Sequence, residues 1–143
     1  MSTLQNQDVF RLVVEEAFNK GNYQVLPACF EPVFIEHQFG LHPTIEGLQA
    51  DIQYLRNAFP DLNLTIDDMV AVDGKVWAQS TARGTNRGGF MGPPNGKSFE
   101  IVVFDVCRFE NGKIVEHWGS PDRFHLLMQL GLLPKPASAG AAG

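Results

Sequence analysis

Hydrophobic positions in the first 60 residues recur every three or four residues, which is the spacing of amphipathic helices. Three helices are predicted: one over residues 6–19, a short one from about Tyr23, and one over residues 45–59 with Thr44 as its N-cap. An extended segment over residues 33–38 separates the second helix from the third. The amino-terminal part of the chain is therefore mainly helical.

After Pro60 the pattern changes to the strict alternation that is typical of strands with one buried face. Asp73-Gly74 and Asn111-Gly112 are hairpin turn dipeptides between alternating stretches, so residues 62–120 are predicted to be mainly antiparallel strand. A Gly- and Pro-rich loop over residues 85–96 interrupts them, and a short helix is expected after Asp122. Helices followed by antiparallel strands predict an α+β fold in which helices cover one face of a curved sheet.

Composition narrows the class of protein. With 143 residues, 44% of them hydrophobic, the chain is expected to form one domain over residues 1–134, followed by a low-complexity, disordered tail over residues 135–143. The net charge of −5 and the absence of a basic cluster argue against nucleic acid as a partner. No signal peptide or membrane-spanning stretch is visible, so we expect a cytoplasmic protein without a membrane partner, with Cys29 and Cys107 reduced in the core.

One carboxylate interrupts an apolar strand. Asp105 lies in the run IVVFDVC, and burying an unpaired charge there would cost several kcal/mol. The Asn111-Gly112 turn brings the chain back so that His117 approaches it. An acid and an imidazole in an apolar wall predict a general acid/base site. The alternatives are a structural or outward-facing Asp105 and a hydrogen-bonded strand histidine at 117.

The length of this turn decides whether the two side chains meet. A two-residue loop pairs Glu110 with Lys113 and puts His117 on the opposite sheet face from Asp105. A three-residue loop pairs Phe109 with Lys113 and puts Asp105 directly opposite His117, with their Cβ atoms about 5 Å apart. The residues alone leave both registers open.

Other polar residues can be interpreted as structural or as functional. Glu36 and His37 are neighbours on a strand, so both cannot line one pocket without a bulge. Asp122 precedes a helix and is expected to cap it, and Arg83 is either a rim residue or a solvated strand end. Histidines and cysteines show no ligand spacing, so no metal site is expected.

Five segments together are similar to one family: FNKGNYQVL, FIEH, LRNAFPDLNLTIDDMVA, ARGTNRGGFMGPPNGK and NGKIVEHWGSPD. In this order and spacing, over about residues 6–134, the chain resembles the SnoaL-like polyketide cyclases of the nuclear transport factor 2-like superfamily. The resemblance implies a cone-shaped barrel in which a curved, mainly antiparallel sheet wraps around the N-terminal helices and encloses a hydrophobic pocket. It also implies a homodimer formed through the convex sheet face.

The resemblance also bears on the site. Cyclases of this family carry an acid/base aspartate on the last strand, at a pocket-facing position that matches Gly119 here. A pocket-facing Gly119 selects the three-residue loop, and acid/base work then falls to Asp105, His117 and His37. The residues expected to bind substrate, with the two tryptophans as stacking candidates, are Glu36, Trp77, Arg83, Phe90, Val103, Cys107, Trp118 and Asp122.

Two functions remain open from the sequence. The first is a cofactor-independent acid/base enzyme acting on a small hydrophobic carbonyl or ester compound, as a cyclase by intramolecular aldol condensation or as an isomerase or dehydratase. The second is a non-catalytic protein that binds a small apolar ligand. Fold alone does not separate them, because one fold supports many activities.

Overall fold

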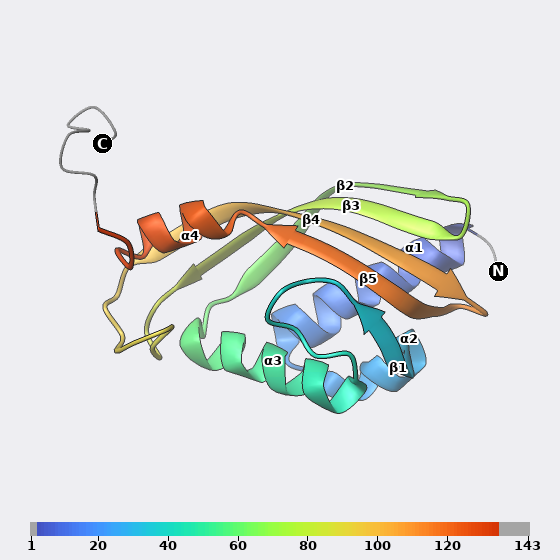
Figure 1. The fold of residues 1–143 in the computed structure, drawn as a ribbon, viewed down its shortest axis with the longest axis horizontal. Coiled ribbons are helices and arrows are strands. Elements are labelled where there is room, and N and C mark those ends of the chain that lie inside the picture. The colour runs from blue at the N-terminus through green and yellow to red at the C-terminus, as the bar shows by residue number, and fades with distance from the viewer. Residues whose placement is uncertain (1–2, 135–143) are drawn as a thin grey trace.

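A computed structural model describes residues 3–134 of the chain (Figure 1). The helical part comprises α1 (Thr3–Leu12), the π-helical turn η1 (Val13–Phe18), the 3₁₀ turn η2 (Tyr23–Val25), α2 (Leu26–Cys29) and α3 (Ile45–Ala58). The strands are β1 (Phe30–Glu36), β2 (Asn63–Val72), β3 (Lys75–Thr85), β4 (Ser98–Glu110) and β5 (Lys113–Pro121), and α4 (Arg123–Gln129) follows them. The tail expected at residues 135–143 lies outside the described residues.

Local sequence explains where the long helix α3 begins. The Thr44 side chain accepts a hydrogen bond from the Gly47 backbone N–H at 3.0 Å, as the sequence predicted. The apolar side of α3 then turns inward, with Leu48 and Ile52 buried. None of the helices in residues 3–134 is long and apolar enough to span a bilayer.

The five strands form one curved sheet in the order β1-β5-β4-β3-β2. Strands β2 to β5 pair antiparallel, whereas β1 runs parallel to β5 at the edge. Figure 1 shows α1, α2 and α3 together on one side of this sheet. The predicted α+β cone is confirmed, with a mixed sheet that is not closed.

The hairpin between β4 and β5 differs from the predicted one. Glu110 pairs with Lys113, and Asn111 and Gly112 both have positive φ (52° and 79°), so the loop has two residues and the predicted three-residue loop is wrong. Phe109 pairs with Ile114, but Arg108 pairs with Glu116, which leaves Val115 as an extra residue in β5. This bulge shifts the alternation by one residue and turns His117 to the concave face.

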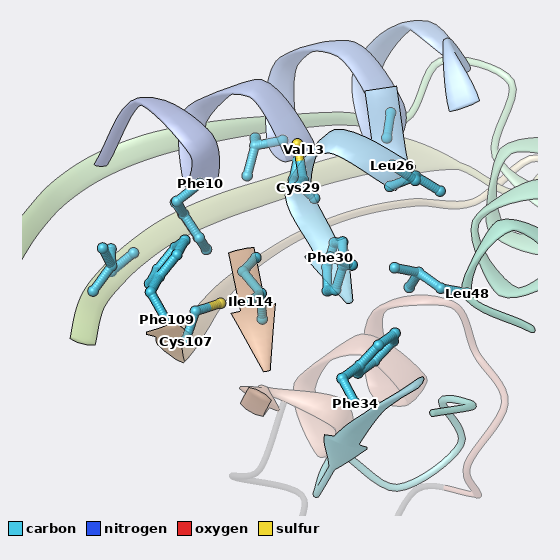
Figure 2. Close-up of a cluster of buried hydrophobic side chains, with 14 of the residues drawn as sticks. Phe10, Val13, Leu26, Cys29, Phe30, Phe34, Leu48, Cys107, Phe109 and Ile114 are labelled. Carbon is cyan, nitrogen blue, oxygen red and sulfur yellow. The ribbon is translucent and has the colours of Figure 1, made fainter. Parts of the chain in front are cut away.

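Buried apolar side chains fill the space between the helices and the concave sheet face in two clusters. Figure 2 shows the first, which brings Phe10, Leu26 and Leu48 from the helices together with Cys107 and Ile114 from the strands. The second gathers around Phe59 and includes residues of α4. Between the clusters the helices and the sheet leave the cavity described below.

Candidate functional site

The cavity has a volume of about 300 Å³ and lies against the concave sheet face. Its lining is mostly apolar and combines helix, strand and loop residues, among them Phe10, Val14, Leu48, Phe59, Phe90 and Val103. Such a space holds a small molecule by burying its apolar surface, while a few polar groups fix its orientation. Two of the residues expected to bind substrate, Phe90 and Val103, are therefore in this lining.

Three titratable side chains form a hydrogen-bonded chain on the cavity wall. His117 from β5 contacts Glu36 of β1 through Nδ1 (2.7 Å to Oε2) and Asp105 of β4 through Nε2 (2.7 Å to Oδ1). Glu36 is the most enclosed, with 3% of its side chain exposed, against 12% for His117 and 15% for Asp105. The chain thus runs from a buried carboxylate through the imidazole to a more exposed carboxylate.

The register of the strands explains this meeting. Glu36 pairs with His117 across the parallel β1–β5 ladder, and Cys107 pairs with His117 across the antiparallel β4–β5 ladder. Asp105 is opposite Gly119, so its carboxylate reaches His117 diagonally along the same face. Asp105 and His117 share one face, as the pocket-facing Gly119 implied, although the pairing partner of Asp105 is Gly119 and not His117.

The two carboxylates hold His117 in its charged form. Burial disfavours the imidazolium, but the hydrogen bonds and charges of Asp105 and Glu36 outweigh it and raise the pKa of His117 from 6.5 to about 9. A doubly protonated imidazole donates one N–H to each carboxylate, whereas a neutral ring has a single N–H. At neutral pH His117 is therefore an imidazolium, hydrogen-bonded on both sides.

The neighbouring thiol does not take part as an anion. Cys107 lines the cavity, but burial, with the charges of Asp105 and Glu36, raises the pKa of its thiol well above 9. Cys107 is free of any disulfide, as is Cys29. Of the expected substrate-binding residues, Cys107 and Glu36 join Phe90 and Val103 in the lining.

His37 lies outside the cavity, which corrects its expected part in the acid/base site. Its side chain is 42% exposed, its Nε2 lies 2.8 Å from Glu116 Oε2, and its ring stacks on Trp118 with centroids 4.8 Å apart. Strand neighbours alternate in direction, so the inward position of Glu36 sends His37 outward. The same alternation puts Trp118 on the outer face beside His37, away from the cavity.

Three other expected substrate contacts are also elsewhere. Trp77 is 49% exposed on the convex face, because its neighbours Val76 and Ala78 occupy the buried side of β3. Arg83 pairs with Glu100 at 2.8 Å on that outer face. Asp122 accepts a hydrogen bond from the His125 backbone N–H at 3.2 Å and caps α4, which is its structural interpretation.

Sequence reasoning missed several polar residues of the lining: Gln38, which directly follows the Glu36-His37 pair, and also Asp51, Tyr54 and Arg123. It also missed that Glu36 would be a partner of His117, because the parallel pairing of β1 with β5 carries no local signal. Among residues 3–134, no group of three or more His, Cys, Asp or Glu side chains is arranged to hold a metal ion.

Comparison with solved structures gives close matches over nearly the whole chain. TsrD from Streptomyces laurentii is 29% identical, covers 93% of this chain and 99% of its own, and has a TM-score of 0.84. IdmH from Streptomyces antibioticus, described as a proposed polyketide cyclase, is 33% identical over 89% of this chain and 99% of its own, with a TM-score of 0.77. AclR from Streptomyces galilaeus, described as a proposed hydroxylase, is 26% identical over 99% and 95%, with a TM-score of 0.82.

No curated protein matches this sequence. The model of the SnoaL-like polyketide cyclases, however, matches residues 8–130, which contain every element from η1 to α4 and all three members of the hydrogen-bonded chain. This chain therefore belongs to the SnoaL-like polyketide cyclase family.

Proposed function

We propose that this protein is a cofactor-independent acid/base enzyme that cyclises a small hydrophobic carbonyl or ester compound by intramolecular aldol condensation. The observation that carries the proposal is the Glu36–His117–Asp105 chain, with both hydrogen bonds at 2.7 Å, on the wall of a mostly apolar cavity. Buried charges of this kind are costly unless they are paired, and they concentrate at functional sites. Isomerisation and dehydration begin with the same proton transfer.

Each member of the chain has a distinct part in this reaction. Asp105, the more exposed carboxylate, takes a proton from the carbon next to a substrate carbonyl, and the C–H electrons move to the carbonyl oxygen to form an enolate. The imidazolium of His117 stabilises this negative charge, while Glu36 holds the ring through Nδ1. The enolate carbon then attacks a second carbonyl of the same molecule, and the new alkoxide receives the proton back from Asp105.

The position of Asp105 supports this assignment. Cyclases of the family carry their acid/base aspartate where this chain has Gly119, and Asp105 is the direct cross-strand partner of Gly119. Side chains on paired residues of one face start about 5 Å apart. A carboxylate on β4 thus reaches the same part of the cavity as an aspartate on β5 would.

Proton abstraction is testable without the natural substrate. In D₂O, the protein should catalyse deuterium incorporation into the methyl group of 2-acetylnaphthalene. Proton NMR measures this as the loss of the methyl signal. Asp105→Asn should reduce the protein-dependent rate at least 100-fold, because it removes the base but keeps the shape of the side chain. Glu100→Gln, which neutralises an exposed outer-face carboxylate 2.8 Å from Arg83, is the matched control and should exchange like the wild type.

Two results would contradict the proposal. If Asp105→Asn exchanges as fast as the wild type, Asp105 is not the base. If the wild type binds the ketone without exchanging its protons, the protein is a non-catalytic carrier of apolar ligands.

We also propose that a second copy of this chain covers the convex sheet face. All of the helices α1, α2 and α3 lie on the concave side, yet the convex face exposes large apolar side chains: Val70, Trp77, Val102 and Phe104. Arg83–Glu100 and Arg108–Glu110 ion pairs flank these side chains on the same face. An apolar centre with a charged rim is the usual composition of a protein interface.

A further inference from the structure

Gly119 makes room for a side chain from the segment that follows β1. A Cβ atom at position 119 would overlap the side-chain oxygen of Gln38 and would lie 2.8 Å from Cε1 of His117. Real Cβ atoms essentially never approach other heavy atoms so closely. The end of the Gln38 side chain therefore occupies, beside the imidazole, the space that any larger residue at 119 would fill.

Gln38 is also fixed to the hydrogen-bonded chain by its backbone. Its N–H donates to Glu36 Oε2 at 3.0 Å, and the same oxygen accepts from His117 Nδ1 at 2.7 Å. One carboxylate oxygen thus sets the position of both the imidazole and the start of the Gln38 side chain. This shared contact places the backbone of Gln38 next to the acid/base pair.

The amide of Gln38 has capacity to bind a ligand. Gln38 lines the cavity, and its side-chain amide makes no hydrogen bond to any residue within 3–134. A side-chain amide offers two N–H donors and one acceptor oxygen, and polar groups of a cavity wall that lack a protein partner are satisfied by a ligand or by water. A carbonyl oxygen next to Asp105 is a suitable acceptor.

We infer that the side-chain amide of Gln38 donates a hydrogen bond to the substrate carbonyl oxygen beside Asp105, and that Gly119 is required because it leaves space for this amide. The inference rests on the proposed function, since it assumes a carbonyl compound in the cavity. It makes Gln38 the residue that selects a carbonyl over an apolar group of the same shape. Gly119 acts through Gln38 as a positioning residue.

Two naphthalenes of similar shape test the selection: 2-acetylnaphthalene, which carries the carbonyl, and 2-ethylnaphthalene, which lacks it. Their dissociation constants are measured by calorimetry for the wild type, Gln38→Leu, Gln38→Met, Gly119→Ala and the double variant Gln38→Leu/Gly119→Ala. The ratio of the two constants cancels changes in apolar contact that affect both compounds alike. Circular dichroism melting verifies that each variant is folded.

Loss of one hydrogen bond should reduce the preference for the ketone about fivefold in both Gln38 variants. Gly119→Ala should produce a similar loss in the wild-type protein and no further loss in the Gln38→Leu protein, because the displaced amide is already absent. An unchanged preference in Gln38→Leu and Gln38→Met would overturn the role of Gln38. If Gly119→Ala reduces the preference as much in the Gln38→Leu protein as in the wild type, Gly119 does not act through Gln38.

The outcome also separates this inference from the proposed function. If the preference does not change in the variants but Asp105→Asn abolishes deuterium exchange, only the role of Gln38 fails. If the wild type shows no exchange but the preference falls as expected, Gln38 selects the carbonyl in a binding protein. If the wild type binds neither naphthalene, both proposals fail.

Discussion

Replacing Glu36 with glutamine should make His117 a weaker base. Glu36→Gln keeps an oxygen that accepts from Nδ1 and removes the negative charge. In the wild type, two carboxylates at equal distances of 2.7 Å raise the pKa of His117 from 6.5 to about 9 against the opposing effect of burial. If each supplies half of this effect, losing one should lower the pKa of His117 by more than one unit, to below about 8, which is a change of at least about 1.4 kcal/mol.

The measurement is an NMR titration of the His117 Cε1–Hε1 signal from pH 5 to pH 10. Glu116→Gln is the matched control, since Glu116 contacts His37 at 2.8 Å but not His117, and it should leave the pKa of His117 near 9. The reasoning is refuted if His117 titrates near 6.5 in the wild type. It is equally refuted if Glu36→Gln and Glu116→Gln have the same effect on His117.

Two further predictions concern pH and assembly. The folded protein holds the His117 proton more tightly than the unfolded chain, so this contribution is complete below pH 6.5 and is lost as the pH rises through about 9. The free energy of unfolding in urea should consequently fall by about 2 kcal/mol between pH 6 and pH 8; a constant or rising value would contradict the pairing of His117. At micromolar concentration the wild type should sediment as a dimer and Trp77→Glu as a monomer, because the substitution puts a charge into the proposed interface; a wild-type monomer would rule out the dimer.

The change of hydrophobic period at Pro60 predicted the order of helices and strands well. Helical and alternating spacing follow from local geometry, and so does the Thr44 cap. The mixed character of the sheet was not predicted, because the parallel pairing of β1 with β5 is a contact between distant segments.

The candidate site was also predicted only in part, because contacts between distant segments decide which of its side chains meet. Asp105 is conspicuous as a lone carboxylate in an apolar strand, but its meeting with His117 depends on the bulge at Val115. A two-residue loop without this bulge would turn His117 outward, and no signal in the stretch Lys113–Val115 distinguishes the two cases. The sequence likewise did not decide between Glu36 and His37, since alternation says that one of two neighbours faces inward without saying which.

The account's central claim is that Asp105 and a protonated His117 carry out proton transfer together. The most direct test is the pH dependence of the protein-catalysed deuterium exchange of 2-acetylnaphthalene, corrected for the uncatalysed rate. The rate should fall with an apparent pKa near 9 as His117 loses its proton, and the fall should move to lower pH in Glu36→Gln, in step with the NMR titration. A rate that continues to rise through pH 10 in both proteins would show that the imidazolium has no part in the reaction and would contradict the claim.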